Sequence, residues 1–194
     1  MTLKSAKIDI EARAQAGKQF FMQGYNCAQA VVAAFADLFP EHDADTLLRI
    51  AASFGGGMGR MRMTCGAVTG MFMLAGLENG NPEPGNMEAR TRNYALVQQL
   101  GKAFEAENDS MICATLLGLR TGKIEPPRPG ERTADYYRAR PCPALVECAC
   151  RIFATHLAEK GQLSIRLRLS LTHNTPSAMA GLARARVQNI ASLW

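Results

Sequence analysis

The apolar residues of the chain recur mainly every three or four positions, which is the spacing of an amphipathic helix. Residues that favour helix starts, such as Asn26 and Asp43, precede two of these segments, and Pro40 and Gly80 follow two of them. The pattern predicts helices over residues 10–24, 26–39, 43–54, 64–80, 86–108, 109–119 and 141–161. No strand pattern occurs before residue 161. We therefore expect an all-α fold, a compact bundle of about six to seven helices.

The last part of the chain has a different pattern. Between residues 163 and 171, leucine and isoleucine alternate with serine and arginine, which is typical of a strand. Residues 177–194 favour a short basic amphipathic helix. This contrast predicts a helical four-cysteine domain over residues 1–160 and an atypical basic C-terminal extension over residues 161–194.

The net charge of +5 belongs to the end of the chain. Residues 160–194 contain five lysines or arginines and no acidic residue, so the charges of residues 1–159 balance. Nucleic-acid binding by the helical domain is therefore not indicated. A basic extension with a strand could exchange between protomers, which would give a homo-oligomer.

The expected cellular compartment rests on two features that the sequence lacks, a signal peptide and a transmembrane segment. Residues 1–18 carry charges throughout and lack the apolar stretch of a signal peptide. No apolar run is long enough to form a transmembrane segment. We expect a cytoplasmic protein, in which six cysteines stay reduced. Their use in catalysis, redox chemistry or metal binding is then favoured over a disulfide framework.

Four cysteines share one position, the first turn of a predicted helix: Cys27, Cys65, Cys113 and Cys142. Free N–H groups and the helix dipole favour an anion there. A thiol so placed can have its pKa lowered from about 8.5 to roughly 3.5–7.5, which makes thiolate available at neutral pH. Thiolate is both a redox nucleophile and a metal ligand, so the placement suits either use. The alternative is that these cysteines are core residues, since cysteine also packs as a small hydrophobe.

Basic residues precede two of the four thiols. Arg60 and Arg62 come before Cys65, and Arg138 and Arg140 come before Cys142. The positive charges would stabilise a thiolate at either position. Two further cysteines have simpler interpretations. We assign Cys148 to the core and treat Cys150 as a neighbour of Cys142, because helix pitch brings it to a nearby face.

The glycine-rich stretch Gly55–Arg60 has a conformational role in this interpretation. It lacks the spacing and the Lys-Ser/Thr of a phosphate-binding loop, and it does not follow a strand. Its four glycines permit a tight turn or a close approach to another chain or ligand. Zinc is not indicated by spacing, because the sequence has no C-x₂-C pair.

Four stretches together resemble a known family. They are "GYNCAQAVVAAF", "ASFGGGMGRMRMTCGAVTG", "DSMICATLLG" and "RPCPALVECA". Their order and spacing are similar to those of the redox-active protein family labelled C_GCAxxG_C_C, whose Cys-Gly-Ala-x-x-Gly element corresponds to Cys65–Gly70. The outer family cysteines correspond to Cys27, Cys113 and Cys142. The resemblance covers roughly residues 10–160 and implies a small, soluble, helical protein. Because such proteins are often encoded beside transporter genes, it also implies an unidentified redox partner associated with a transporter.

The leading hypothesis is that the four cysteines meet at one end of the bundle and carry out thiol–disulfide exchange or electron transfer. Cys65 would be the attacking thiol, stabilised by Arg60 and Arg62, and a second cysteine would resolve the mixed disulfide. Whether the protein is an enzyme stays open. In a cofactor-binding version, Gly66, Gly70 and the same two arginines would contact the cofactor.

Two alternatives stay open beside this hypothesis. In the first, all four thiolates ligate an iron–sulfur cluster or another thiolate-bound metal, since four cysteines is the usual number for such clusters. In the second, the domain is a non-catalytic interaction module whose cysteines lie in the core. Its C-terminal extension would then dock on a partner.

Overall fold

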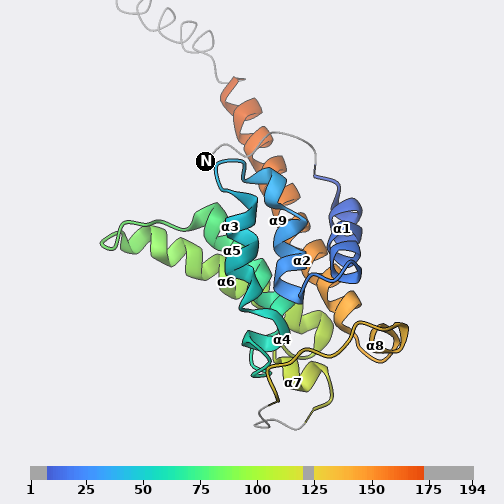
Figure 1. Ribbon diagram of the computed structural model, residues 1–194. Coiled ribbons are helices and arrows are strands. Elements are labelled where there is room, and N and C mark those ends of the chain that lie inside the picture. The colour runs from blue at the N-terminus through green and yellow to red at the C-terminus, as the bar shows by residue number, and fades with distance from the viewer. Residues whose placement is uncertain (1–7, 120–124, 173–194) are drawn as a thin grey trace, which may run out of the picture. The chain divides into compact units, whose positions relative to one another are not determined.

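The computed structural model describes residues 8–119 and 125–172, with side chains through residue 162. In chain order the helical elements are α1 (Ile10–Met22), α2 (Cys27–Ala33), η1 (Ala36–Leu38), α3 (Ala44–Ala52), α4 (Gly55–Met58), α5 (Gly66–Asn79), α6 (Met87–Asn108), α7 (Cys113–Leu116), α8 (Ala134–Arg138) and α9 (Cys142–Thr172). The predicted all-α class is confirmed (Figure 1). The short elements α4 and α8 are additional to the predicted helices. In the described part of the chain, no helix is both long and apolar enough to cross a bilayer.

The predicted helix starts are built as their sequences indicate. The Asn26 side chain accepts hydrogen bonds from the backbone N–H groups of Ala28 and Gln29, both at 3.0 Å. The Gln29 side chain in turn accepts from the backbone N–H of Asn26, which completes a capping box. Asp43 caps α3 by accepting from the N–H of Thr46 at 2.8 Å. These caps fix the residue at which each helix begins.

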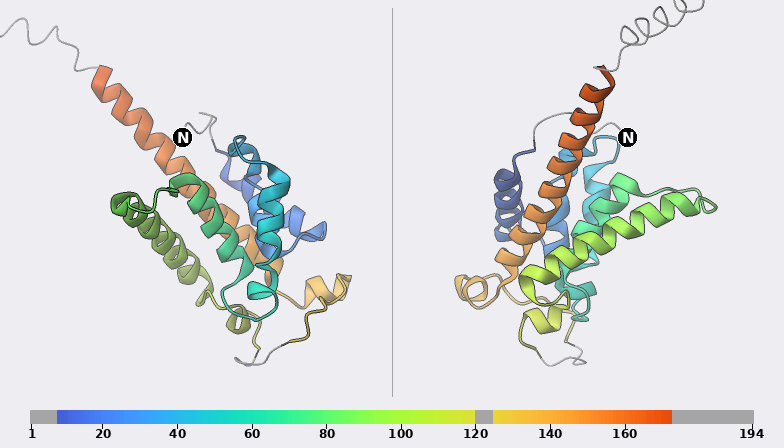
Figure 2. Two further views of the ribbon diagram at one scale, coloured as in Figure 1. Left: turned by 60° about the vertical axis from the view of Figure 1, so that its left-hand side comes forward. Right: turned by 180° about the vertical axis from the view of Figure 1, so that it is seen from behind.

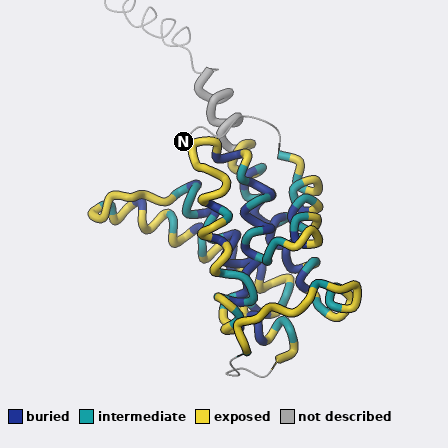
Figure 3. The backbone as a smooth tube through the Cα atoms, in the orientation of Figure 1, coloured by how far each residue is buried: buried dark blue, intermediate teal, exposed yellow. Residues whose placement is uncertain are grey.

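Helix α2 has the central position in the domain (Figures 1 and 2). It packs against α1, α3 and α5, and α6 packs against the other side of α5. Figure 3 shows the buried residues concentrated on α2, α5 and the first part of α9, whereas the loop before α6 and the start of that helix are exposed. The largest fully buried side chains are phenylalanines, namely Phe21, Phe35, Phe39, Phe104 and Phe153.

Two glycines let α2 and α5 approach each other closely. A Cβ atom added at Gly70 would lie 2.8 Å from the carbonyl oxygen of Ala28 and 2.9 Å from Cβ of Val31. One added at Gly66 would lie 2.9 Å from Cβ of Cys27. Both glycines are fully helical and buried, so their function here is to remove a side chain from a helix crossing.

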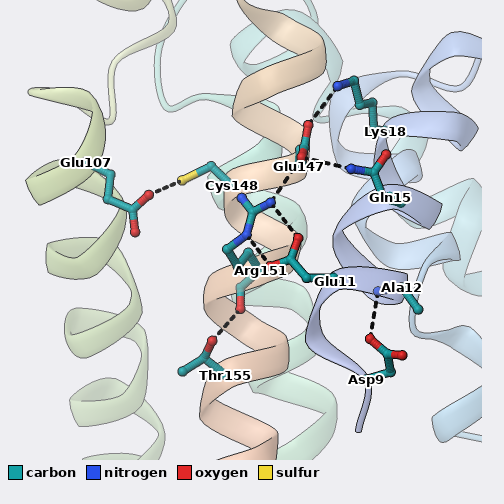
Figure 4. Close-up of polar contacts among 10 residues, drawn as sticks. All are labelled: Asp9, Glu11, Ala12, Gln15, Lys18, Glu107, Glu147, Cys148, Arg151 and Thr155. Atoms are coloured by element: carbon teal, nitrogen blue, oxygen red, sulfur yellow. Dashed lines mark hydrogen bonds and ion pairs between the residues drawn. The ribbon is translucent and has the colours of Figure 1, made fainter.

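A network of charged side chains joins α1 to α9 (Figure 4). Arg151 on α9 pairs with Glu11 on α1 at 2.9 Å and with Glu147, one turn earlier on α9, at 3.0 Å. Glu147 also accepts from Gln15 at 3.1 Å and pairs with Lys18 at 2.9 Å. These contacts fix the position of α9 on α1 and therefore the place where α9 begins.

The chain divides into two compact units, Met1–Leu157 and Ala158–Trp194, and the second begins within α9. The strand expected over residues 163–171 is wrong, because the helix continues to Thr172. Extending an existing helix fixes one residue for each new hydrogen bond, whereas a strand needs a partner strand. Leucine and arginine also favour helix intrinsically. The short helix expected over residues 177–194 lies outside the described residues.

We predict that Gly70→Ala lowers the free energy of unfolding by roughly 1–3 kcal/mol, because the new methyl group meets backbone atoms of α2 that cannot move away. The matched control is Gly76→Ala, on the same helix, where no atom lies within 4 Å of an added Cβ. We expect the control to be stabilised by roughly 0.5–1 kcal/mol through helix propensity. Urea unfolding followed by circular dichroism measures both, and equal effects would contradict the close crossing.

Candidate functional site

The four family-motif thiols lie around one cavity of about 450 Å³. Cys27, Cys113 and Cys142 are the first residues of α2, α7 and α9, and Cys65 is the N-cap of α5. Figure 1 shows α4, α7 and α8 at the same end of the domain. All four cysteines are free thiols. The cavity therefore collects four helix starts that are far apart in the sequence.

A short antiparallel contact positions Cys65 beside Cys113. The backbone N–H of Cys65 donates to the carbonyl of Met111 at 2.8 Å, and that of Cys113 donates to the carbonyl of Met63 at 2.7 Å. Between them Thr64 and Ile112 form an isolated β-bridge. The segments before α5 and α7 are thus held side by side, which brings their first thiols to the cavity.

The position of Cys27 depends on the glycine at the start of α5. Because Gly66 has no side chain, Cβ of Cys27 fits directly against the α5 backbone. The sequence prediction had Gly66 and Gly70 contacting a cofactor. In the structure both lie within the α2–α5 interface instead of lining the cavity. Arg60 and Arg62, predicted with them, do line it.

The glycine-rich stretch forms a left-handed turn beside the thiols. Gly56, Gly57 and Gly59 have φ values of 66°, 70° and 61°. Gly57 is also packed so closely that an added Cβ would lie 2.6 Å from Cβ of Cys113. The tight turn predicted for these glycines is present, and the close approach at Gly57 is to Cys113 of the same chain.

The left-handed conformation extends to residues that do not favour it. Met58, Arg60 and Arg62 have φ values of 60°, 71° and 61°. Such a conformation costs an L-residue with a side chain roughly 1–2 kcal/mol. The surrounding contacts must offset this cost, and the two arginines supply several of them.

Glu125 holds both arginines. Its carboxylate accepts from Arg60 at 2.8 Å and also from Arg62, and Arg60 Nε donates to the carbonyl of Pro126 at 2.7 Å. The two guanidinium groups lower the pKa of the Glu125 carboxyl, with the Arg62 hydrogen bond as the main cause. Arg62 continues into the site, where its guanidinium lies 3.8 Å from Sγ of Cys113. The structure thus places Arg62 on Cys113, whereas the sequence suggested Cys65.

The segment before α9 adds two more arginines to the cavity wall. Arg132 donates to the carbonyls of Phe21 and Tyr25, both at 3.1 Å, and its guanidinium stacks on the Phe21 ring at 4.3 Å. Arg140 stacks on the ring of Tyr136 at 4.8 Å. Arg132, Arg140 and Tyr136 all line the cavity. The cavity containing the thiols is therefore strongly cationic.

These charges separate Cys142 from the other thiols. Its pKa is lowered to about 7, first by a hydrogen bond from the Cys27 thiol and then by the positive charges of Arg140, Arg132 and Arg62. The same hydrogen bond, together with burial, raises the pKa of Cys27 well above its usual value. When Cys142 ionises, the remaining proton of the pair is carried by Cys27 and donated to the Cys142 thiolate.

Burial dominates at the other two cavity thiols. It raises the pKa of Cys65 to about 12, although the N–H groups of Ala67 and Val68 at the start of α5 act in the opposite direction. Burial also raises the pKa of Cys113, against the lowering effect of Arg62. The lowering of the thiol pKa that is expected at helix starts is present at Cys65, but the loss of solvation raises the pKa by more.

The two remaining cysteines lie elsewhere in the domain. Cys148 contacts α6, where it donates to Glu107 at 3.4 Å (Figure 4). It also accepts from Asn108 at 3.3 Å. Cys150 is fully buried directly against Gly17 of α1, so it is a core residue and not a neighbour of Cys142 at the cavity.

Among the described residues, no three cysteine, histidine or acidic side chains are arranged to hold a single metal ion. The type and number of the donors do fit an iron–sulfur cluster, because such clusters are usually held by four cysteine thiolates and four thiols lie around this cavity. The four cysteines would hold such a cluster and would have to give up their protons to do so.

Sequence reasoning missed three residues of this site: Glu125, Arg132 and Tyr136. One signal was available. The stretch "ERTADYYRARPC" places further arginines and tyrosines shortly before Cys142, in addition to the predicted Arg138 and Arg140. Arg138 is exposed and pairs with Asp135, so of the two it is Arg140 that lines the cavity.

Comparison with known proteins gives one match. The sequence model of the family described as "Putative redox-active protein (C_GCAxxG_C_C)" matches residues 25–156. No curated protein and no solved structure matches the chain. The matched range is more than half of the sequence and contains every cysteine of the cavity. The chain belongs to the C_GCAxxG_C_C family.

Proposed function

We propose that this protein is a thiol–disulfide redox protein in which Cys142 is the nucleophile and Cys27 the resolving cysteine. The observation that carries the proposal is the pairing of Cys142 with Cys27 at the cavity, where Arg132 and Arg140 also lie. It joins a thiol that ionises near neutral pH to one that keeps its proton. A nucleophile and its resolving partner need this difference.

The reaction proceeds in two displacements. The Cys142 thiolate attacks one sulfur of a substrate disulfide, which breaks the sulfur–sulfur bond and releases one substrate thiolate. Cys27 then loses its proton to that leaving thiolate and attacks Cys142 sulfur, which releases the second substrate thiolate. The protein ends with a Cys27–Cys142 disulfide, and two electrons have passed to the substrate.

Cys142 replaces Cys65 as the proposed nucleophile because of solvation. Both thiols are buried, but at Cys65 the loss of solvation outweighs the stabilising N–H groups and raises the pKa to about 12. At neutral pH only a negligible fraction of such a thiol is ionised, and the thiolate is the reactive species. Cys113 lies beside Arg62, so its charge would be stabilised once formed, and we assign it to a supporting role.

An iron–sulfur cluster on the four thiolates is the second candidate, supported by the gathering of all four thiols around one cavity. The bound cluster would supply one-electron transfer. The four cysteines would then act as ligands, and the nearby arginines would offset part of their negative charge.

We predict that Cys142 is alkylated first when the reduced protein meets iodoacetamide. Since its pKa is about 7, the alkylation rate should reach half of its plateau near pH 7, rising with pH as the thiolate forms. Cys65, with a pKa of about 12, should stay unmodified over the same range. Mass spectrometry of peptides after timed alkylation measures both, and faster reaction of Cys65 would contradict the assignment.

Arg140→Gln should move the Cys142 alkylation profile to higher pH, because removing the positive charge destabilises the thiolate. The variant leaves unchanged the other groups that line the cavity with the Cys142 thiolate, namely Tyr136, Arg132, Arg62 and the thiols of Cys27 and Cys113. Arg138→Gln is the matched control, since Arg138 is two residues away, exposed and paired with Asp135. An unchanged midpoint in Arg140→Gln, or an equal shift in the control, would remove the electrostatic explanation.

Cysteine variants test the two roles separately. We expect Cys27→Ser to stop at the mixed disulfide between Cys142 and the substrate, because no resolving thiol remains. Cys142→Ser should give no mixed disulfide, and Cys148→Ser, whose side chain contacts α6, should behave as wild type. Mass spectrometry of the non-reduced protein after reaction with 2-hydroxyethyl disulfide identifies each species. A Cys65–Cys113 disulfide in place of Cys27–Cys142 would overturn the assignment.

Purification without air distinguishes the two candidates. We expect a colourless protein without stoichiometric iron or sulfide, whose thiols alkylate as described above. Broad visible absorption with stoichiometric iron and sulfide, together with protection of all four cavity thiols, would establish the cluster and overturn the dithiol reaction.

A further inference from the structure

We propose that the disulfide reduced at Cys142 is a small organic molecule carrying carboxylates, held by the arginines of the cavity. This inference rests on the proposed thiol–disulfide function and specifies its substrate class. Three features of the cavity lead to it, namely its depth, its charge and a buried donor without a partner in its wall.

The depth of the site selects a small molecule over a protein. Cys142 is 8% exposed and its sulfur is reached through a cavity of about 450 Å³, a volume typical of small-ligand pockets. A protein disulfide has to bring its backbone to the attacking sulfur. Here the segment containing Pro127, Pro129 and Gly130 forms part of the wall around the cavity. A disulfide linking two small organic groups can enter where such a backbone cannot.

The charge of the cavity selects an anion. Four arginines line it, while the charged partner that contacts two of them, Glu125, neutralises only part of their charge. Arg132 donates to main-chain carbonyls and Arg140 stacks on an aromatic ring, and neither contact cancels a positive charge. A ligand carboxylate would pair with the positive charges of both arginines.

A buried donor in the wall supports this choice. Arg62 is 7% exposed, lines the cavity, and its Nε–H has no hydrogen-bond partner among the described residues. A charged donor left without a hydrogen-bond partner at this depth is destabilising. An anionic ligand in the cavity would offset that cost, whereas a neutral or cationic one would not.

The positive charges of the arginines act on both the bound substrate and the leaving thiolate. Attack by the Cys142 thiolate breaks the substrate sulfur–sulfur bond and releases a thiolate that already carries a carboxylate. The proton of Cys27 passes to this leaving group, and the two electrons come from the cysteine pair. The arginines hold the carboxylates during the first displacement and stabilise the negative charge on the departing sulfur.

Three small disulfides of different charge test the proposal on the full-length reduced protein. They are 3,3′-dithiodipropionate, which is anionic, 2-hydroxyethyl disulfide, which is neutral, and cystamine, which is cationic. We expect the Cys27–Cys142 disulfide to form fastest with the anion and slowest with the cation, with about 10- to 100-fold between them at low salt. Added salt should reduce the ratio, because it screens the arginines.

Variants at one arginine separate binding from thiolate formation. Arg140→Gln slows the reaction with every disulfide, because it raises the fraction of protonated Cys142. The informative quantity is therefore the ratio of the rate with dithiodipropionate to the rate with 2-hydroxyethyl disulfide. We expect this ratio to fall in Arg140→Gln, to be retained in Arg140→Lys, and to be unchanged in Arg138→Gln. Circular dichroism checks that each variant is folded, and the salt dependence of the wild type tests the charge effect without any variant.

The outcomes separate the two levels of the proposal. Equal rates for the three disulfides, or fastest reaction with cystamine, would overturn the charge selection while the Cys27–Cys142 chemistry stands. Faster oxidation by a protein disulfide, such as oxidised thioredoxin, than by dithiodipropionate would overturn the small-molecule substrate. Failure of every disulfide to oxidise the pair would overturn the proposed function itself.

Discussion

The close crossing of α2 and α5 is the constraint on which the site depends. Gly66 and Gly70 remove the side chains that would separate the two helices, so the start of α2 comes directly against the start of α5. Cys27 and Cys65 then reach the same cavity, although 37 residues separate them in the sequence. The other two thiols arrive by separate routes, Cys113 through the bridge beside Thr64 and Cys142 through the anchoring of α9 on α1. The glycines of the family motif thus allow the helix crossing that brings two of its cysteines to the cavity.

Two opposing effects decide which thiol ionises. A helix start favours a thiolate, and burial opposes one by removing water. Burial prevails at Cys65, even though the N–H groups of Ala67 and Val68 act to lower its pKa. At Cys142 the balance reverses, because the Cys27 hydrogen bond and three arginines act together against a smaller loss of solvation. Position at a helix start therefore does not by itself make a cysteine reactive, and the surrounding charges determine the outcome.

Local signals explain how much of this arrangement the sequence could predict. Asn26 and Asp43 mark helix starts by a mechanism that acts within three residues, and the structure has both caps. The gathering of the four thiols was the leading hypothesis, since each lies in the first turn of a predicted helix. The ranking of the thiols was not accessible, since it depends on Cys27 and on arginines such as Arg132, which is held by carbonyls more than 100 residues away, of Phe21 on α1 and of Tyr25 after it. The alternating pattern over 163–171 misled for a related reason. Alternation is compatible with a strand, but the helix already formed from Cys142 decides the backbone of the residues that follow.

The left-handed turn shows why the cationic wall and the fold cannot be separated. Arg60 and Arg62 occupy a conformation that costs each of them energy, and an ordinary turn would avoid it. The conformation brings both guanidinium groups to one carboxylate, Glu125, and directs Arg62 to Cys113. Strained residues at a binding site persist when the surrounding contacts determine their position. Here the contacts come from Glu125, which accepts hydrogen bonds from both guanidinium groups. The turn therefore links the glycine-rich stretch, the segment after α7 and the thiols into one unit, in which moving any one part would displace the charges that the Cys142 thiolate needs.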